Sequence, residues 1–299
     1  MPIHFSCPYC GETTLVDDPF AGHTGPCVNC GRLVTVPSAR AGYSFRAAVQ
    51  GVRRGNYQLA IIGGLLVIGF GIAFFAFYQA VGKPALLAAN QAAAKRTCAN
   101  NLRKIGQAIL AYQAANNGNF PPAYSVDAAG KPLHSWRVLI LPYLGSEGQL
   151  LHQQINLNEP WDAPQNLSLA AQMPRLFASP LDQNARTLHE SNYVVITGPK
   201  TMFPDAASRN MTDIKDDPAS TLLVVEVESN GKSWMEPVDL VGNQIDFQIG
   251  GDLGGNHSNG ANVLFADGEV RFLPDNTSAA DIEAMSTVAG HEGVERPRH

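Results

Sequence analysis

Four cysteines near the N-terminus carry the clearest chemistry in this sequence. They form two Cys-x-x-Cys pairs, Cys7 with Cys10 and Cys27 with Cys30, and a glycine follows each pair. The glycines allow a tight turn that brings two sulfur atoms to one point. Four thiolates are the ligand set of a closed tetrahedral site, so the spacing predicts a structural Zn²⁺ ion. A redox Cys-x-x-Cys motif is the weaker interpretation, because it needs no second pair.

A pair of glutamates forms a second candidate site, for ligand binding. Residues 222–228 (LLVVEVE) predict a central strand, because the first four are apolar on both faces. Glu226 and Glu228 would lie on one face, since strand side chains alternate. Two such carboxylates suit calcium binding or glycoside hydrolysis. The alternative that we favour is a solvated sheet rim.

An Asp-Gly pair, Asp267-Gly268, lies between two alternating apolar segments and predicts a β-hairpin. A two-residue type I′ turn would place Val263 opposite Phe272 and four apolar side chains on one face. The Asp-Gly pair therefore has a structural explanation.

His257 lies in a glycine-rich loop before this hairpin. Five strand residues separate the loop from the turn, about 17 Å at the usual rise. We expect His257 to order its loop through hydrogen bonds. A site shared by His257 and Asp267 would require the loop to double back along the hairpin.

The elements that must position these residues begin with an uncharged apolar run from Leu59 to Tyr78. A helix of this length crosses about 30 Å of hydrocarbon, so residues 57–80 are expected to form one transmembrane helix and a retained anchor. We expect it to separate a zinc ribbon over residues 1–37 and a basic linker over 38–56 from a domain over 84–285, with a flexible tail over 286–299.

The basic residues around the run suggest an orientation. Only Lys83 follows the run closely, whereas four arginines precede it without an acidic residue among them: Arg40, Arg46, Arg53 and Arg54. This asymmetry favours a cytoplasmic N-terminus and an extracytoplasmic C-terminal domain in the cytoplasmic (inner) membrane.

A second helix is expected after Pro84, which would separate it from the first or kink the junction between them. Its apolar residues recur every three or four positions and form one stripe that would pack on an antiparallel β-sheet: Cys98, Leu102, Ile105, Ile109 and Tyr112. On that stripe Cys98 is interpreted as a small buried hydrophobe and not as a reactive thiol. The fold class expected is α+β, a long N-terminal helix on an antiparallel sheet.

The net charge of the C-terminal segment argues against one class of partner. The segment 84–299 holds 15 basic and 23 acidic residues, a net charge of −8, which argues against nucleic acid because phosphate binding needs a basic face. Trp136 and Trp161 could stack on a sugar ring, although core positions are the favoured interpretation for Trp.

Several motifs occur in order along the chain. They are residues 97–108 (TCANNLRKIGQA), 119–122 (NFPP), 135–144 (SWRVLILPYL), 158–162 (NEPWD), 192–198, and His257 followed after nine residues by Asp267-Gly268. Together they resemble the planctomycete prepilin-like family that carries domain of unknown function 1559, whose signature is H-x9-DG. The usual leader site, Gly-Phe-Thr-Leu-x-Glu, does not precede Leu59. The resemblance implies a pilin-like fold.

We therefore expect a non-enzymatic, membrane-anchored structural or interaction protein of the pilin or pseudopilin type. Its partners would be membrane lipid and the proteins of a pilin-like or secretion-type assembly. An extracytoplasmic domain that binds a glycan or a cation is the alternative. A hydrolase that uses the same carboxylates ranks last, because no catalytic motif is evident.

Overall fold

The computed structural model describes residues 2–38, 57–229 and 231–290. Most of the expected basic linker (39–56) and the end of the expected tail (291–299) lie outside this range. The chain divides into two compact units, Met1–Gln79 and Ala80–His299. Each is described by itself, and the architecture is mixed α+β.

The first unit begins with two small antiparallel hairpins. β1 (Ile3–Ser6) pairs with β2 (Thr13–Val16), and β3 (Thr24–Pro26) pairs with β4 (Leu33–Thr35), with the short 3₁₀ helix η1 (Asp18–Phe20) between them. Each hairpin is closed by one of the Cys-x-x-Cys turns. The module buries only a few side chains, so it needs another source of stability.

An apolar helix follows, α1 (Tyr57–Phe77), continued by a π-helical turn, η2 (Tyr78–Gly82), and by α2 (Lys83–Ala115). Pro84 does not separate two helices, which was one of the two expected effects, since helix runs from Tyr57 to Ala115. Pro84 lies in the first turn of α2, where its missing N–H is tolerated, and the π-helical turn directly before it absorbs the local misfit.

The second unit is built on a four-stranded antiparallel sheet in the order β12-β11-β9-β7. The strands are β7 (Tyr193–Val194), β9 (Leu222–Glu226), β11 (Gly260–Phe265) and β12 (Val270–Pro274). β9 is central, as the apolar pattern predicts, but it ends at Glu226.

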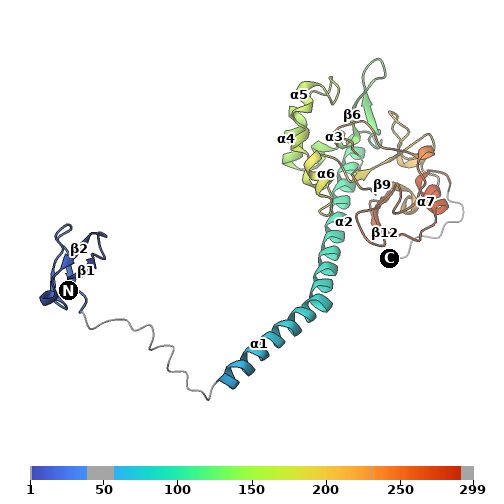
Figure 1. Cartoon of the computed structure of the whole chain (residues 1–299). Coiled ribbons are helices and arrows are strands. Elements are labelled where there is room, and N and C mark those ends of the chain that lie inside the picture. The colour runs from blue at the N-terminus through green and yellow to red at the C-terminus, as the bar shows by residue number, and fades with distance from the viewer. Residues whose placement is uncertain (1, 39–56, 230, 291–299) are drawn as a thin grey trace. The chain divides into compact units, whose positions relative to one another are not determined.

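α2 packs along this sheet (Figure 1). Its buried stripe begins with Ala94 and Cys98 and continues through Leu102, Ile105 and Ile109, close to the predicted set. Gly106 is also buried in the stripe, and a Cβ atom there would lie 2.8 Å from Leu264 Cδ1 on β11. The glycine therefore allows the helix to approach the sheet closely.

The remaining segments cover the sheet and α2 with short elements. Trp136–Leu144, expected to be buried helix or strand, forms α3 (Trp136–Leu139) and η3 (Leu141–Tyr143). The others are β5 (Tyr124–Val126), β6 (Pro132–Ser135), α4 (Ser146–Gln154), α5 (Pro164–Leu167), η4 (Ala170–Gln172), η5 (Arg175–Phe177), α6 (Gln183–Leu188), β8 (Ile196–Thr197), η6 (Met211–Asp213), η7 (Pro218–Ser220), β10 (Leu240–Val241), η8 (Gly242–Gln244) and α7 (Ala279–Ser286).

A buried ion pair connects α3 to the sheet. Arg137 Nη2 lies 2.6 Å from Asp239 Oδ1 and also donates to the Tyr193 carbonyl oxygen, while Asp239 accepts from the Val195 N–H. Every charge in this group has several hydrogen-bonding partners, as burial requires.

The folded part of the chain extends past α7. Val288 is buried in the core, its N–H donates to the Lys200 carbonyl, and its carbonyl accepts from the Lys215 N–H. The packed region therefore reaches Gly290 and includes the first five residues of the expected tail.

The hairpin between β11 and β12 differs from the predicted type. Only Gly268 in its turn has positive φ (85°), and the Gly268 N–H donates to the Phe265 carbonyl. This is a type I turn followed by a left-handed glycine, which adds one loop residue and shifts the register. Asn262, not Val263, is opposite Phe272.

Candidate functional site

The four N-terminal cysteines converge on one point. Cys7 Sγ lies 3.7 Å from Cys30 Sγ, and Cys10 Sγ lies 3.8 Å from Cys27 Sγ. Sulfur atoms bound to one tetrahedral zinc at about 2.3 Å each would be about 3.8 Å apart. All four sulfur atoms lie within 4.8 Å of one another. The cluster therefore fits a tetrahedral metal ion, and its sulfur atoms are too far apart for disulfides.

The two turns that carry the sulfur atoms are built alike. The N–H groups of Gly11 and Gly31 donate to the carbonyls of Cys7 and Cys27, and both glycines have positive φ. At Cys27 the backbone N–H groups of Cys30 and then Asn29 lower the thiol pKa to about 6. At Cys10 the Glu12 N–H acts to lower the thiol pKa, but burial and the hydrogen bonds of the other three thiols outweigh it and raise the pKa to about 12. A bound metal would therefore have to displace protons from the cluster.

α1 has the composition and length of a membrane span. Helix from Tyr57 onward contains a window of mean hydropathy 2.5, and none of that window is buried within the protein. The large apolar side chains of α1 are exposed on all sides of the helix, as lipid contact requires. By composition and length, the helix could cross a membrane.

A second group of potential metal ligands lies inside the C-terminal unit. Cys98 on α2, Glu226 at the end of β9 and His257 in the glycine-rich loop each place a ligand atom within 4.8 Å of the others. Cys98 and Glu226 are 0% exposed and His257 is 8% exposed. His257 Nε2 lies 3.4 Å from Glu226 Oε1. We call these three residues the buried triad.

The glycine-rich loop brings His257 to this position by crossing the end of β9. The Gly254 N–H donates to the Glu226 carbonyl, and Asn256 Nδ2 donates to the Val227 carbonyl. Positive φ at Gly254 and Gly255 allows the chain to turn there. The loop therefore does turn back, but onto β9 and not along the hairpin.

The Glu226 carboxylate is held from both sides. Its Oε2 accepts from the Asn262 N–H at 2.7 Å and from Asn262 Nδ2 at 2.9 Å. Its Oε1 faces His257. Glu226 is thus a buried and oriented acceptor, which corrects our expectation that it forms a solvated rim together with Glu228.

Cys98 is buried beside this carboxylate, as the stripe predicts. Its Sγ lies 3.4 Å from Ser179 Oγ, and burial first, then the nearby Glu226 charge, raise the thiol pKa to about 12. Without a cation beside it the sulfur is a neutral thiol. Lys95 is the nearby basic residue: its Nζ lies 3.0 Å from the centre of the Phe272 ring, and burial lowers its pKa against the opposing effect of Glu226.

The other two sequence candidates lie elsewhere. Asp267 is exposed at the hairpin turn, where it pairs with Arg271 at 2.6 Å and accepts from the Glu269 N–H. Glu228 is exposed beyond the end of β9 and lines a shallow hollow with Asp182 and Asn256. The structure therefore brings together His257 and Glu226, and adds Cys98, which we had interpreted as packing alone.

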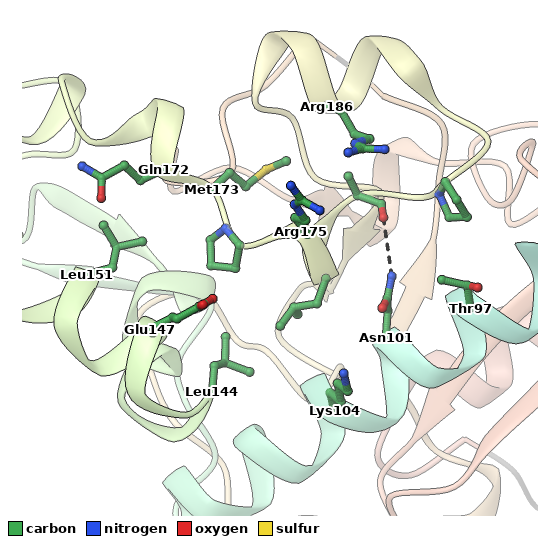
Figure 2. A pocket seen from close by; sticks show the side chains of 15 residues that line it. Thr97, Asn101, Lys104, Leu144, Glu147, Leu151, Gln172, Met173, Arg175 and Arg186 are labelled. Atoms are coloured by element: carbon green, nitrogen blue, oxygen red, sulfur yellow. Dashed lines mark hydrogen bonds between the residues drawn. The ribbon is translucent and has the colours of Figure 1, made fainter.

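A cavity with a volume of about 840 Å³ lies beside α2. Figure 2 shows Lys104 and Asn101 of α2 on one side and Arg175 and Arg186 facing them, with Glu147 across the opening. Three basic side chains and one acidic side chain make this lining net positive. Sequence analysis missed the cavity, because its lining comes from four separate segments.

The tryptophans do not form an open stacking platform. Trp136 is fully buried between Phe177 and the Arg137–Asp239 pair, to which its Nε1 donates. Trp161 is half-buried against the core. Trp136 is therefore a core residue, which removes one basis for glycan binding.

Comparison with known proteins gives one result. Residues 88–222 match a family described as SBP_bac_10, protein of unknown function (DUF1559). The curated proteins and the solved structures contain no match.

Proposed function

We propose that this chain, which matches the DUF1559 family over residues 88–222, is a non-enzymatic, single-pass membrane protein of the pilin or pseudopilin type. A zinc-bound module would lie in the cytoplasm, and the DUF1559 domain would lie outside it. The observation that carries the proposal is the helix from Tyr57 to Ala115, whose first part is apolar on every side and whose last part is buried along one stripe.

Zinc is the ion that best suits the four-cysteine cluster. Thiolates select soft or borderline metals. The Cys7–Cys30 and Cys10–Cys27 sulfur separations of 3.7 and 3.8 Å match a tetrahedral edge of about 3.8 Å. Because the module has almost no core, the metal would supply much of its folding free energy. Its function would be to present a stable surface to a cytoplasmic partner.

The pilin-like interaction is supported by the segment where α2 emerges beyond the span. Leu86 and Leu87 are 54% and 55% exposed. In a pilin-like assembly such apolar side chains would pack against the helices of neighbouring copies, as exposed apolar patches usually mark contacts.

The test is photo-crosslinking in the membrane. A crosslinker placed at Leu86 should trap a second copy of the chain or another subunit, whereas one placed at Lys131, at the exposed β5–β6 turn, should not. Membrane protein that stays monomeric with both probes contradicts an assembly role.

A second candidate function, binding of a small extracytoplasmic ligand, is favoured by the basic cavity. Lys104, Arg175 and Arg186 suit an acidic ligand such as a uronic-acid glycan. Calorimetry should detect its binding to the native protein and not to Arg175→Gln/Arg186→Gln, while a neutral glycan gives no heat with either. Equal binding heats for the native protein and the double variant would exclude the cavity as the binding site of the acidic glycan.

A further inference from the structure

We propose that the buried triad, Cys98, Glu226 and His257, is a second metal site that holds one Zn²⁺ ion. This inference concerns the interior of the C-terminal unit and is independent of membrane topology and assembly. It gives the histidine of the H-x9-DG signature a role as a ligand, with Glu226 and not Asp267 as its partner.

The separations within the triad fit a shared ion better than a direct ion pair. His257 Nε2 and Glu226 Oε1 are 3.4 Å apart. A charge-assisted hydrogen bond between these groups would be about 2.7–2.9 Å long. A nitrogen and an oxygen bound to one tetrahedral zinc at about 2.1 Å each lie about 3.4 Å apart.

Among the described residues, the imidazole has one polar partner, Glu226, which Nε2 faces. His257 Nδ1 is buried and has no hydrogen-bond partner among the described residues. The loop is held instead by Gly254 and Asn256. The expectation that His257 orders its loop through hydrogen bonds is confirmed only at Nε2, whose 3.4 Å contact with Glu226 Oε1 links the loop to β9. This separation is long for a charged pair, and a zinc ion bound between the two groups would account for it.

The charges of the three ligands also favour a bound Zn²⁺ ion. A thiolate, a carboxylate and a neutral imidazole around Zn²⁺ sum to zero, which removes most of the cost of burying Glu226. Lys95 is the competing source of positive charge, but its ammonium lies against the Phe272 ring. The contact between Lys95 and the Phe272 ring does not explain why the Cys98 thiol and the His257 imidazole both lie beside the Glu226 carboxylate.

The chemical types of the three ligand atoms favour zinc over calcium and magnesium. A sulfur, a nitrogen and an oxygen donor suit zinc, whereas calcium and magnesium take oxygen ligands. Three protein ligands leave a fourth position for water or a small exogenous ligand. The ion would also join α2 to the end of β9 and to the glycine-rich loop, three segments that are distant in sequence.

The experiment is metal analysis of the full chain purified from membranes. The native protein should contain two equivalents of zinc, and a variant in which Cys7, Cys10, Cys27 and Cys30 are all serine should retain one. Adding Cys98→Ala, Glu226→Gln or His257→Ala to that variant should remove the last equivalent.

Two matched substitutions serve as controls in the same background. Asp267→Asn changes the other half of the signature, and Lys95→Gln removes the competing positive charge; both should leave one equivalent of zinc. A folded four-serine variant that holds no zinc overturns the proposal, as does loss of zinc in the controls to the same extent as in His257→Ala.

Cobalt titration of the native chain gives a second measurement, which does not depend on the folding of the variants. Two ions should bind, one with the strong sulfur charge-transfer absorption of four thiolates and one with that of a single thiolate. Binding of only the four-thiolate ion contradicts the second site.

Discussion

At the scale of single residues, Asp182 shows how one carboxylate can hold three segments. It caps α6 through the Ala185 N–H, and its second oxygen accepts from Asn192 Nδ2 at 2.8 Å and the Ser229 N–H at 3.0 Å. Burial acts to raise the pKa of Asp182, but these hydrogen bonds outweigh it and lower the pKa below the usual 3.8. The ionised form therefore stabilises the fold.

Asp182→Ala should lower the free energy of unfolding by about 1–2 kcal/mol at neutral pH, because a helix cap and two further hydrogen bonds are lost. Asp182→Asn keeps one acceptor and should lose less. The native contribution is complete above the ordinary pKa and disappears as the pH falls through the lowered one. Denaturant unfolding at several pH values should show the difference between native protein and Asp182→Ala shrinking below about pH 4, and a constant difference would contradict this account.

The residues of the two candidate metal sites differ in how far the sequence predicts them. The four N-terminal cysteines are adjacent in pairs, so local spacing predicts their cluster. The buried triad is assembled from residues 98, 226 and 257, which meet only through tertiary packing. The sequence singles out each of its members, but it suggests Glu228 and Asp267 as partners, because alternation and proximity along the chain are local signals.

At the scale of elements, contact between α2 and the sheet depends on close approach at Gly106. Gly106→Ala would improve helix propensity in an exposed helix. Here the added Cβ atom would lie 2.8 Å from Leu264 Cδ1, so we expect a loss of about 1–3 kcal/mol from overpacking. Arg96→Ala, on the exposed face of α2, should change stability by less than about 0.5 kcal/mol. Thermal unfolding measures both, and a more stable Gly106→Ala would refute the close contact.

The elements themselves are largely predictable, and their ends are not. An uninterrupted apolar run predicts α1, and burial of one stripe or of both faces leaves the apolar patterns that predict α2 and the central β9. It does not predict that helix continues through Pro84, or that Gly268 shifts the hairpin register by one residue. Both features depend on the local backbone conformation, which the pattern of apolar residues does not specify.

At the scale of the whole molecule, the two units should respond differently to loss of metal. A strong chelator should unfold residues 2–38, which lack a core, and leave the larger unit folded on its own two apolar clusters. Limited proteolysis after chelation should then remove the N-terminal module first and leave a stable fragment that begins near the apolar helix. Simultaneous degradation of both units would show that they are not independent.

The central claim is that the apolar helix places the four-cysteine module and the DUF1559 domain in different compartments. Protease can be added to sealed membrane vesicles of known orientation, with one epitope before residue 7 and one after residue 290. With the outer face exposed, the C-terminal epitope should be lost and the N-terminal one protected, and inverted vesicles should give the opposite result. Equal accessibility of both epitopes in either orientation would contradict the account.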